Sequence, residues 1–295
     1  SAFNYRNHVQ FALTQYGRLG FRAAGSHKVI AIRECHILQP ALAALFPRIE
    51  VDPQEAGEIE AISLRAGAED ETLVLFETEA EPPEMSLDLA ISAALLRPDG
   101  STMTLSGGDS VLIDVRGRSF RVTGGSFFQV NTAGAGLLVD LVLEALALTG
   151  GETVLDLYSG VGLFSAFIAP LAARVIGVEA YEPAVEDAAV NLDEFENVEI
   201  YAAAVEDALP GLPAARPWAA AVLDPPRAGC TPEALSALLA AQVARIVYVS
   251  CDPATFARDA RRLVAGGYRL EWVQPVDLFP QTHHIECVAL FQIDR

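Results

Sequence analysis

Two residues near the C-terminus have the chemistry of a nucleophile and a base. Cys251 directly follows the apolar run RIVYVS (245–250) and directly precedes Asp252-Pro253, so its thiol lies where a predicted strand leaves the core. Glu286 starts the apolar run that closes the chain. A buried structural thiol is the ordinary alternative for Cys251. A thiolate and a carboxylate together can add to a carbon and remove its proton, which is the division of labour in covalent catalysis with a general base.

Histidines next to Glu286 are alternative bases. His283 and His284 lie in FPQTHHIE (279–286), and in an extended strand they would point to opposite faces, with His284 on the face of Glu286. An ordinary polar contact is the alternative for each of them. The sequence leaves this choice open and places His284 among the candidate substrate-contacting residues.

Carboxylates and glycines mark a nucleotide site earlier in the chain. The turn Asp156-Leu-Tyr158-Ser-Gly160-Val-Gly162 follows the apolar run TVL. A carboxylate at Asp156 suits a cofactor with a cationic amino group and no phosphate. Glu179 ends the next predicted strand, where an acid accepts hydrogen bonds from ribose hydroxyls. An acid, two glycines and a second acid, without a third phosphate-facing glycine, indicate S-adenosylmethionine rather than NAD.

A third predicted strand end carries Asp224-Pro225-Pro226-Arg227. Two prolines fix the backbone where it leaves the sheet, which holds Asp224 and Arg227 over the site. A stiff turn without further function is the alternative. Beside a methyl donor the thiol has a specific use: thiolate addition to C6 of uracil makes C5 nucleophilic, and a base must then remove the C5 proton.

The pattern of elements predicts an α/β chain with two domains. Residues 123–295 alternate apolar strands with helices, which predicts a parallel sheet of the Rossmann-like methyltransferase type, with ligands at the carboxyl ends of the strands. Residues 1–122 predict an α+β domain, which is expected to be the RNA-binding part of the chain because it carries the basic clusters described below. Its predicted strands are RLGFRAA, HKVIAIR, EIEAISLR, TLVLFETE and SVLIDVR, and its predicted helices are PALAALF and SLDLAISAALL (86–96).

Composition and charge bear on whether the protein is a membrane protein, a secreted protein or a nucleic-acid-binding protein. The 295 residues include 52% hydrophobic ones, and neither an 18-residue apolar run nor a charged leader occurs, so no membrane span or secretory signal is expected. Four widely spaced cysteines indicate a reducing, cytoplasmic setting. The net charge of −19 disfavours a nucleic-acid partner, yet residues 1–33 hold five basic residues and no acid. A second basic cluster comprises Arg116, Arg118 and Arg121. Such local patches are compatible with a polyanion, although simple solvation is an equal alternative.

Six segments, in this order, resemble the bacterial RNA (uracil-5-)-methyltransferases, which form 5-methyluridine in ribosomal or transfer RNA. They span nearly the whole chain: YRNHVQF (5–11), GGSFFQVN (124–131), LDLYSGVGLFS (155–165), DPPRAG (224–229), VSCDPATFARD (249–259) and FPQTHHIE.

The resemblance assigns roles to individual residues. It implies Cys251 as the nucleophile and Glu286 as the base that takes the C5 proton of a uracil flipped into the site. It implies that Gln129, Tyr158, Glu179 and Asp224 bind S-adenosylmethionine. Holding the uracil is an alternative role for Gln129 and Asp224, with Arg227 supporting that pocket.

The chain departs from the family in two ways. Many members bind an iron–sulfur cluster through four cysteines, and only Cys35 matches one of them here, so no cluster and no metal is expected. Many members also begin with a small RNA-binding barrel, which we expect to be missing. Three alternatives compete with this interpretation. One is a cytosine-5 RNA methyltransferase, whose catalytic cysteine follows Pro in the strand-four motif or is paired with a second catalytic cysteine. Another is an amino-group methyltransferase, whose motif has an aromatic residue after the prolines. The third is a truncated RNA-binding homologue with little activity. Arg227 occupies the position after Pro226, which disfavours the first two.

Overall fold

The computed structural model describes residues 1–54, 57–79, 89–212 and 218–293. The chain forms two compact units, Ser1–Thr132 and Ala133–Arg295. The sequence places the boundary ahead of residue 123. Residues 123–131 stay with the first unit because their backbone is tied to its N-terminal strand: Asn7 N–H donates to Val130 O at 2.8 Å, and Arg6 bridges Asn131.

The first unit is built on a seven-stranded sheet in the order β3-β2-β1-β4-β5-β6-β7. β5 and β6 run parallel, and the other neighbours are antiparallel. The strands are β1 (His8–Leu13), β2 (Leu19–Arg22), β3 (Val29–Ala31), β4 (Ala61–Ala66), β5 (Thr72–Glu77), β6 (Ser92–Leu96) and β7 (Thr102–Ser106). A separate hairpin joins β8 (Ser110–Val115) to β9 (Arg118–Thr123).

One face of this sheet is covered by α1 (Pro40–Leu45) and the following turn η1 (Phe46–Arg48). The rings of Phe11 and Phe46 stack with centroids 5.0 Å apart, which anchors that turn on β1. The short turn η2 (Ala68–Asp70) joins β4 to β5. The unit is thus α+β, as the sequence predicts.

The predicted helix over residues 86–96 is wrong in its second half. Residues 92–96 form β6, and residues 86–88 lie outside the described residues. The run is rich in Ala and Leu, which favours a helix locally, but pairing with β5 and β7 and burial of Ala93, Ala94 and Leu95 determine its structure. β1 also lies in a segment for which no strand is predicted.

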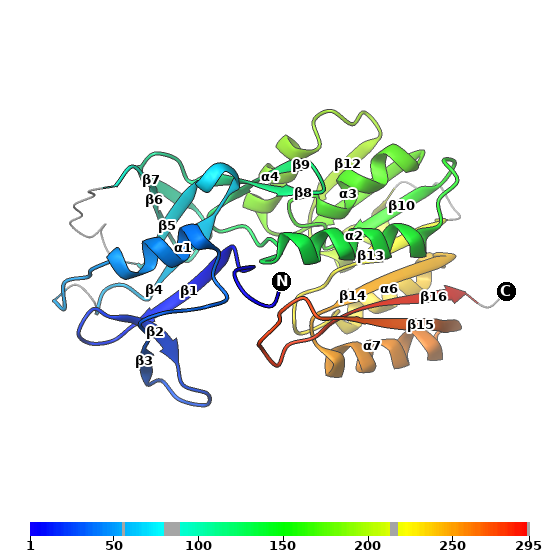
Figure 1. The fold of residues 1–295 in the computed structure, drawn as a ribbon. Coiled ribbons are helices and arrows are strands. Elements are labelled where there is room, and N and C mark those ends of the chain that lie inside the picture. The colour runs from blue at the N-terminus through cyan, green and yellow to red at the C-terminus, as the bar shows by residue number, and fades with distance from the viewer. Residues whose placement is uncertain (55–56, 80–88, 213–217, 294–295) are drawn as a thin grey trace. The chain divides into compact units, whose positions relative to one another are not determined.

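The second unit contains the predicted doubly covered sheet, in the order β12-β11-β10-β13-β14-β16-β15 (Figure 1). Its strands are β10 (Thr153–Leu157), β11 (Arg174–Glu179), β12 (Val198–Ala202), β13 (Ala220–Leu223), β14 (Arg245–Ser250), β15 (Tyr268–Val276) and β16 (Glu286–Ile293). β10 to β14 are parallel, so their carboxyl ends form one edge of the sheet.

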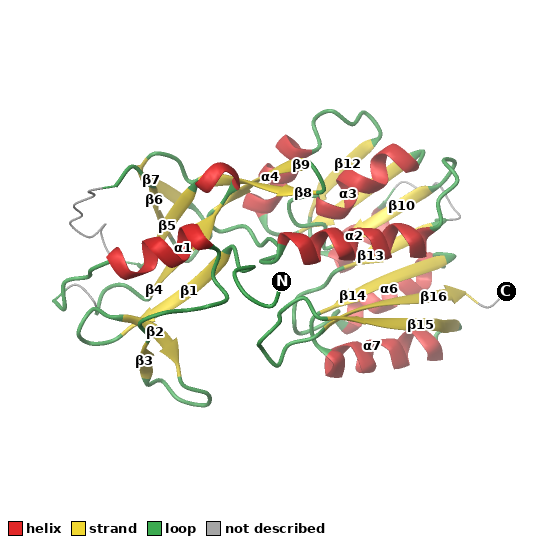
Figure 2. Ribbon diagram, in the orientation of Figure 1, coloured by secondary structure: helices red, strands yellow, loops and turns green. Residues whose placement is uncertain are grey.

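Helices cover both faces of this sheet. One face packs against α5 (Val205–Ala208), α6 (Pro232–Ala241) and α7 (Pro253–Ala265), through a core that includes Trp218, Tyr248 and Phe291. Figure 2 shows α2 (Thr132–Leu146) and α3 (Leu163–Ile168) on the opposite face. The remaining elements are α4 (Glu182–Asn191), η3 (Ala169–Leu171) and η4 (Leu209–Gly211). Among the described residues, no helix has the length and apolarity that crossing a bilayer requires.

β16 is inserted antiparallel between β14 and β15. Ser250 pairs with Cys287, so the last residue of β14 lies opposite the second residue of β16. The antiparallel direction brings the start of β16 to the edge formed by the carboxyl ends of β10 to β14. Glu286 therefore lies at that edge, although 35 residues separate it from Cys251 in the sequence.

Candidate active site at the carboxyl edge of the second sheet

The turn between β10 and α3 has an unusual backbone. Tyr158, Gly160 and Gly162 have φ of 64°, 53° and 90°, in the left-handed region that favours glycine. A Cβ placed at Gly160 meets nothing within 4 Å, so the backbone there borders open space. Tyr158 is the non-glycine exception, and its N–H donates to Val178 O at 2.9 Å. The turn thus presents bare backbone at the edge of the sheet.

Asp156 is fully buried beneath this turn. Its Oδ2 accepts a hydrogen bond of 2.6 Å from Ser165 Oγ of α3, whereas Oδ1 has no hydrogen-bond partner. Burial raises the pKa of this carboxyl to about 6. A buried carboxylate oxygen without a donor has an unmet requirement that a cationic or hydrogen-bonding ligand group would satisfy.

Glu179, at the end of β11, holds the same turn from its other side. Its Oε2 accepts from Gly160 N–H at 2.9 Å, and its Oε1 accepts from Tyr181 N–H at 2.8 Å. The carboxylate is half-buried and keeps further lone pairs for a ligand. The open backbone at Gly160, the orphaned oxygen of Asp156 and the carboxylate of Glu179 fit the predicted S-adenosylmethionine.

Tyr158 points toward the protein interior. Its hydroxyl is within hydrogen-bonding reach of the Cys230 thiol, and burial raises its pKa. The ring packs against the core beneath α6 and α7. Among the predicted cofactor residues, Tyr158 is therefore the one whose polar group is directed to the core.

Cys251, Glu286 and Asp224 share one electrostatic environment. Burial is the main cause that raises the pKa of Cys251, followed by the charges of Glu286 and Asp224, while the Arg227 charge lowers it. Glu286 is 2% exposed, and burial together with Asp224 raises its pKa to about 8. The structure thus brings together the predicted nucleophile, the predicted base and the strand-end acid. Buried ionisable groups with raised pKa values that act on one another are typical of functional sites.

The residue after Cys251 starts helix α7 and joins it to the Asp224 loop. Asp252 caps the helix by accepting from Ala254 N–H at 2.9 Å and from Thr255 N–H at 3.1 Å. Arg227 Nε lies 3.6 Å from Asp252 Oδ2. Thr255 Oγ1 donates to Arg227 O at 3.1 Å. The cap therefore fixes the start of α7 next to the thiol and also contacts the loop that carries Arg227.

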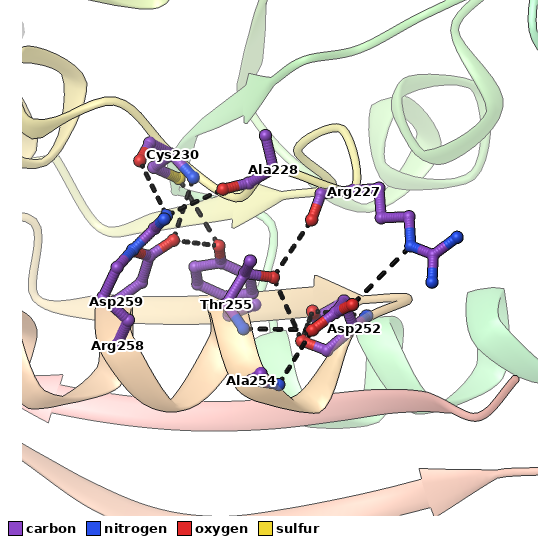
Figure 3. Close-up of polar contacts among 10 residues, drawn as sticks. Arg227, Ala228, Cys230, Asp252, Ala254, Thr255, Arg258 and Asp259 are labelled. Atoms are coloured by element: carbon purple, nitrogen blue, oxygen red, sulfur yellow. Dashed lines mark hydrogen bonds and ion pairs between the residues drawn. The ribbon is translucent and has the colours of Figure 1, made fainter. Parts of the chain in front are cut away.

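A second set of contacts, the Asp259 cluster, ties α7 to the same loop (Figure 3). Asp259 is fully buried, and its Oδ2 accepts from Cys230 N–H and from Tyr248 Oη, each at 2.8 Å. Its Oδ1 accepts from Arg258 Nε at 2.9 Å. Arg258 Nη2 also donates to Ala228 O at 2.8 Å. The cluster fixes the loop that follows Asp224 onto the helix that follows Cys251.

Asp259 is not among the residues predicted from the sequence. A signal is present, because Asp259 shares the helical spacing of the buried residues Phe256, Ala260 and Leu263. A carboxylate on the apolar face of a helix needs buried partners. Gly229 is also required here: its φ is 76°, and a Cβ would lie 2.5 Å from both Arg258 Nη2 and Asp259 Oδ2.

The two histidines are arranged differently from the prediction. β16 begins at Glu286, so His283 and His284 belong to the preceding loop rather than to a strand. Their ring centroids are 4.1 Å apart, so the rings lie side by side instead of on opposite faces. Phe279 contacts His284 edge-on at 6.1 Å. The strand alternation used to relate His284 to Glu286 does not apply.

Two predicted residues belong to the first unit. Gln129 is 5% exposed, and its backbone carbonyl accepts from Asn7 Nδ2 at 3.2 Å. Cys35 is a half-buried free thiol that precedes α1. Across the described part of the chain, no group of three or more His, Cys, Asp or Glu residues is placed to hold a metal ion.

The sequence is similar to that of known RNA methyltransferases. The model of the tRNA (uracil-5-)-methyltransferase family matches residues 108–293. An uncharacterized RNA methyltransferase of Gloeobacter violaceus is 35% identical over 98% of this chain and 70% of its own length. A second, from Streptomyces avermitilis, is 35% identical over 98% of this chain and 67% of its own length.

A solved structure agrees with these relatives. The tRNA (uracil-54, C5)-methyltransferase of Pyrococcus abyssi, in complex with S-adenosyl-L-homocysteine, superposes with a TM-score of 0.76 and 28% identity. The match covers 99% of this chain and 76% of that one. It includes both units, so the resemblance extends beyond the Rossmann-like sheet.

Proposed function

The chain belongs to the tRNA (uracil-5-)-methyltransferase family, and on that premise we propose that it methylates C5 of a uridine in ribosomal or transfer RNA through a covalent bond between Cys251 and uracil C6. Dependence on S-adenosylmethionine and action on RNA follow from the family. The covalent route, the residue roles and the choice of RNA are the proposal. Its main support is the convergence of Cys251, Glu286 and Asp224 at one strand edge.

The cofactor site is assigned to the turn after β10. Asp156 Oδ1, Glu179 and the open backbone at Gly160 are the groups that would hold S-adenosylmethionine. When bound, this cofactor supplies an electrophilic methyl group. Glu179 has to exchange or share its present N–H donors to accept from ribose hydroxyls. Gln129, Tyr158 and Asp224 complete the proposed set, with Asp224 or Gln129 alternatively holding the uracil.

Addition by Cys251 begins the reaction. The step needs the thiolate, and the Arg227 charge acts to favour that form against burial and two acids. The sulfur bonds to C6 of uracil, and the electron pair of the C5–C6 double bond shifts toward C5 and the neighbouring carbonyl. C5 thereby becomes the nucleophile that would take the methyl group, and the bond from that methyl to the sulfonium sulfur would break to leave a neutral thioether. Arg227 and His284 are proposed to contact the substrate during this step.

Removal of the C5 proton completes the cycle. Glu286 takes this proton, the C5–C6 double bond forms again, and the bond from Cys251 to C6 breaks to return the thiolate. Glu286 must be ionised to act as the base. With a pKa of about 8 it is mostly protonated at neutral pH in the free protein, so a rate limited by this step is expected to rise with pH toward 8.

A covalent trap tests the proposal. RNA transcribed with 5-fluorouridine carries fluorine where the proton should leave, so Glu286 has nothing to abstract and the adduct persists. Pooled transfer RNA and ribosomal fragments of this kind should give a protein–RNA band on a denaturing gel in the presence of S-adenosylmethionine. Cys251→Ala should abolish the band.

The other thiols of the second unit are the matched controls. Cys230 and Cys287 are buried, and burial raises the pKa of each to about 11. Cys230→Ala and Cys287→Ala should therefore retain the adduct. An adduct that survives Cys251→Ala and disappears with Cys287→Ala would refute the assignment of the nucleophile.

A further inference from the structure

The β2–β3 hairpin projects at the edge of the first unit (Figure 1). Phe21 pairs with Ile30, and Arg22 pairs with Val29. The connection is closed by Ala23 N–H donating to Lys28 O at 2.9 Å and by Ser26 N–H donating to Ala23 O at 3.0 Å. These hydrogen bonds give the tip a defined shape.

Every charge on this hairpin is positive. The hairpin and its flanking residues contain Arg18, Arg22, Lys28 and Arg33, and all four are exposed. The chain has no acid before Glu34, and Glu34 is within 3.7 Å of His36. A protein with a net charge of −19 thus keeps an element without acids of its own at the edge of one sheet. The nearest acids that the packing identifies are the exposed Glu50 and Asp52, which flank Val51 where its carbonyl oxygen abuts Gly17 at the base of the hairpin. A local cationic surface of this kind attracts a polyanion, since charges beyond about 10 Å are screened.

The spacing of the cations suits a nucleic-acid backbone. Arg18 and Arg22 are four residues apart along β2 and its approach, so they share one face of the hairpin. Gly20 lies between them, and its Cβ position falls 2.1 Å from Ile30 O, so only glycine fits and the face between the arginines carries no side chain at that point. Four residues of strand span about 13 Å, roughly two phosphate spacings of an extended nucleic-acid strand.

The opposite face of the hairpin is apolar and partly exposed. Phe21 is 39% exposed and Ile30 is 54% exposed, and they are cross-strand neighbours. One side of Phe21 packs on Phe11, with ring centroids 5.3 Å apart, which leaves its other side accessible. Lys28 lies two residues before Ile30 and therefore shares this face, whereas the two arginines lie on the other. An accessible ring beside a cation is the pairing that single-stranded RNA uses for stacking and phosphate contact.

We propose that the β2–β3 hairpin is an RNA-docking element, with Arg18, Arg22 and Lys28 contacting phosphates and Phe21 contacting an unpaired base. This inference rests on the proposed function, since it takes the bound polyanion to be the RNA that is methylated. The surface provides affinity, and the chemistry remains at the carboxyl edge of the second unit.

Charge removal with a matched control tests it. The test variant combines Arg18→Ala, Arg22→Ala and Lys28→Ala in the full chain. The control combines Arg97→Ala, Arg261→Ala and Arg262→Ala, which removes the same charge at other exposed positions. Binding of a fluorescein-labelled, unmodified transfer RNA transcript is measured by anisotropy at several salt concentrations.

The test variant should bind about tenfold or more weakly, with a salt slope smaller by about two to three, because each lost phosphate contact removes about 0.7–0.9 from the slope. The control should bind as the wild type does. Equal affinity and slope for the test variant and the wild type would overturn the proposal. In that case, increased aggregation of the test variant would show that the cations prevent edge-to-edge association through strand β3. Capture of an acidic protein would instead identify a different partner.

The measurement separates this proposal from the proposed function. If 5-fluorouridine RNA forms no adduct while the test variant still loses RNA affinity, the docking surface stands and the covalent mechanism fails. If the adduct forms at the wild-type rate with saturating RNA but the affinities are equal, the mechanism stands and the docking surface fails.

Discussion

Two cysteine–carboxyl pairs lie in the second unit, and their surroundings differ in kind. Near Cys230, the carboxylate of Asp259 accepts hydrogen bonds from an arginine, a tyrosine and a backbone N–H. Near Cys251, the carboxyl of Glu286 is buried beside another acid, and its pKa is about 8. Asp259 thus accepts hydrogen bonds from three donors, whereas Glu286 lies near the like charge of Asp224.

This difference in hydrogen bonding separates a carboxylate that stabilises the fold, Asp259, from a carboxyl that is proposed to exchange a proton, Glu286. A carboxylate whose oxygens accept several buried hydrogen bonds is held in one geometry. A carboxyl that is buried among acids exchanges its proton near neutral pH, as a catalytic base requires. Residue types alone do not distinguish the two pairs, because each consists of a cysteine and an acid near β14 and its neighbours.

The strongest challenge to this comparison is Glu286→Gln. The amide cannot take the C5 proton, so turnover should fall by about 10² to 10⁴ while addition by Cys251 continues. Ordinary uridine RNA should then accumulate as a methylated covalent adduct, visible on a denaturing gel. Glu233→Gln, at an exposed position of α6, is the control and should turn over normally. Rapid turnover by Glu286→Gln would assign the base to another residue, such as His284.

The Asp259 cluster should respond in stability. Asp259→Asn replaces an acceptor of three donors by a group that presents N–H to at least one of them, so a buried donor loses its partner. We expect a loss of about 3 kcal/mol in the free energy of unfolding, measured by urea denaturation. Glu233→Gln serves again as the control. A loss below about 0.5 kcal/mol would mean that the cluster does not support the fold.

The raised pKa of Glu286 gives a third test, based on pH. Folding raises this pKa from 4.5 to about 8, so between these values the folded protein holds a proton that the unfolded chain has lost. The free energy of unfolding should therefore decrease as pH rises from 5 to 8.5. Asp156, with a pKa of about 6, contributes in the same direction at lower pH.

Glu286→Gln removes the first contribution and keeps the second. Relative to the wild type, this variant should gain roughly 4 kcal/mol in stability between pH 5 and pH 8.5, because it has no carboxyl to ionise in the buried site. Urea denaturation at the two pH values measures the difference. Parallel pH profiles for the two proteins would show that Glu286 is not the buried titrating group.

Much of the second unit is predictable from sequence because its parallel strands are continuous apolar runs with acids or glycines at their ends. The proximity of Glu286 to Cys251 is harder to predict from the sequence, because it depends on β16 inserting antiparallel beside β14. The residues of β6 predict a helix because Ala and Leu favour helices locally, whereas sheet pairing is a long-range property. The predicted arrangement of the two histidines is wrong for a similar reason, because strand alternation does not hold in the loop that contains them.

Tyr248→Phe should cause the smallest change in stability, because it removes a single hydrogen bond to Asp259. The hydroxyl donates to Asp259 Oδ2 at 2.8 Å and lies 3.6 Å from Cys230 Sγ. Its removal leaves Asp259 with two donors, and the ring continues to pack against Phe256. We expect a loss of about 1 kcal/mol in urea denaturation and an unchanged rate of adduct formation. An adduct rate that falls in step with stability would mean that the Asp259 cluster also sets the position of Cys251, since both groups are joined through the first turns of α7.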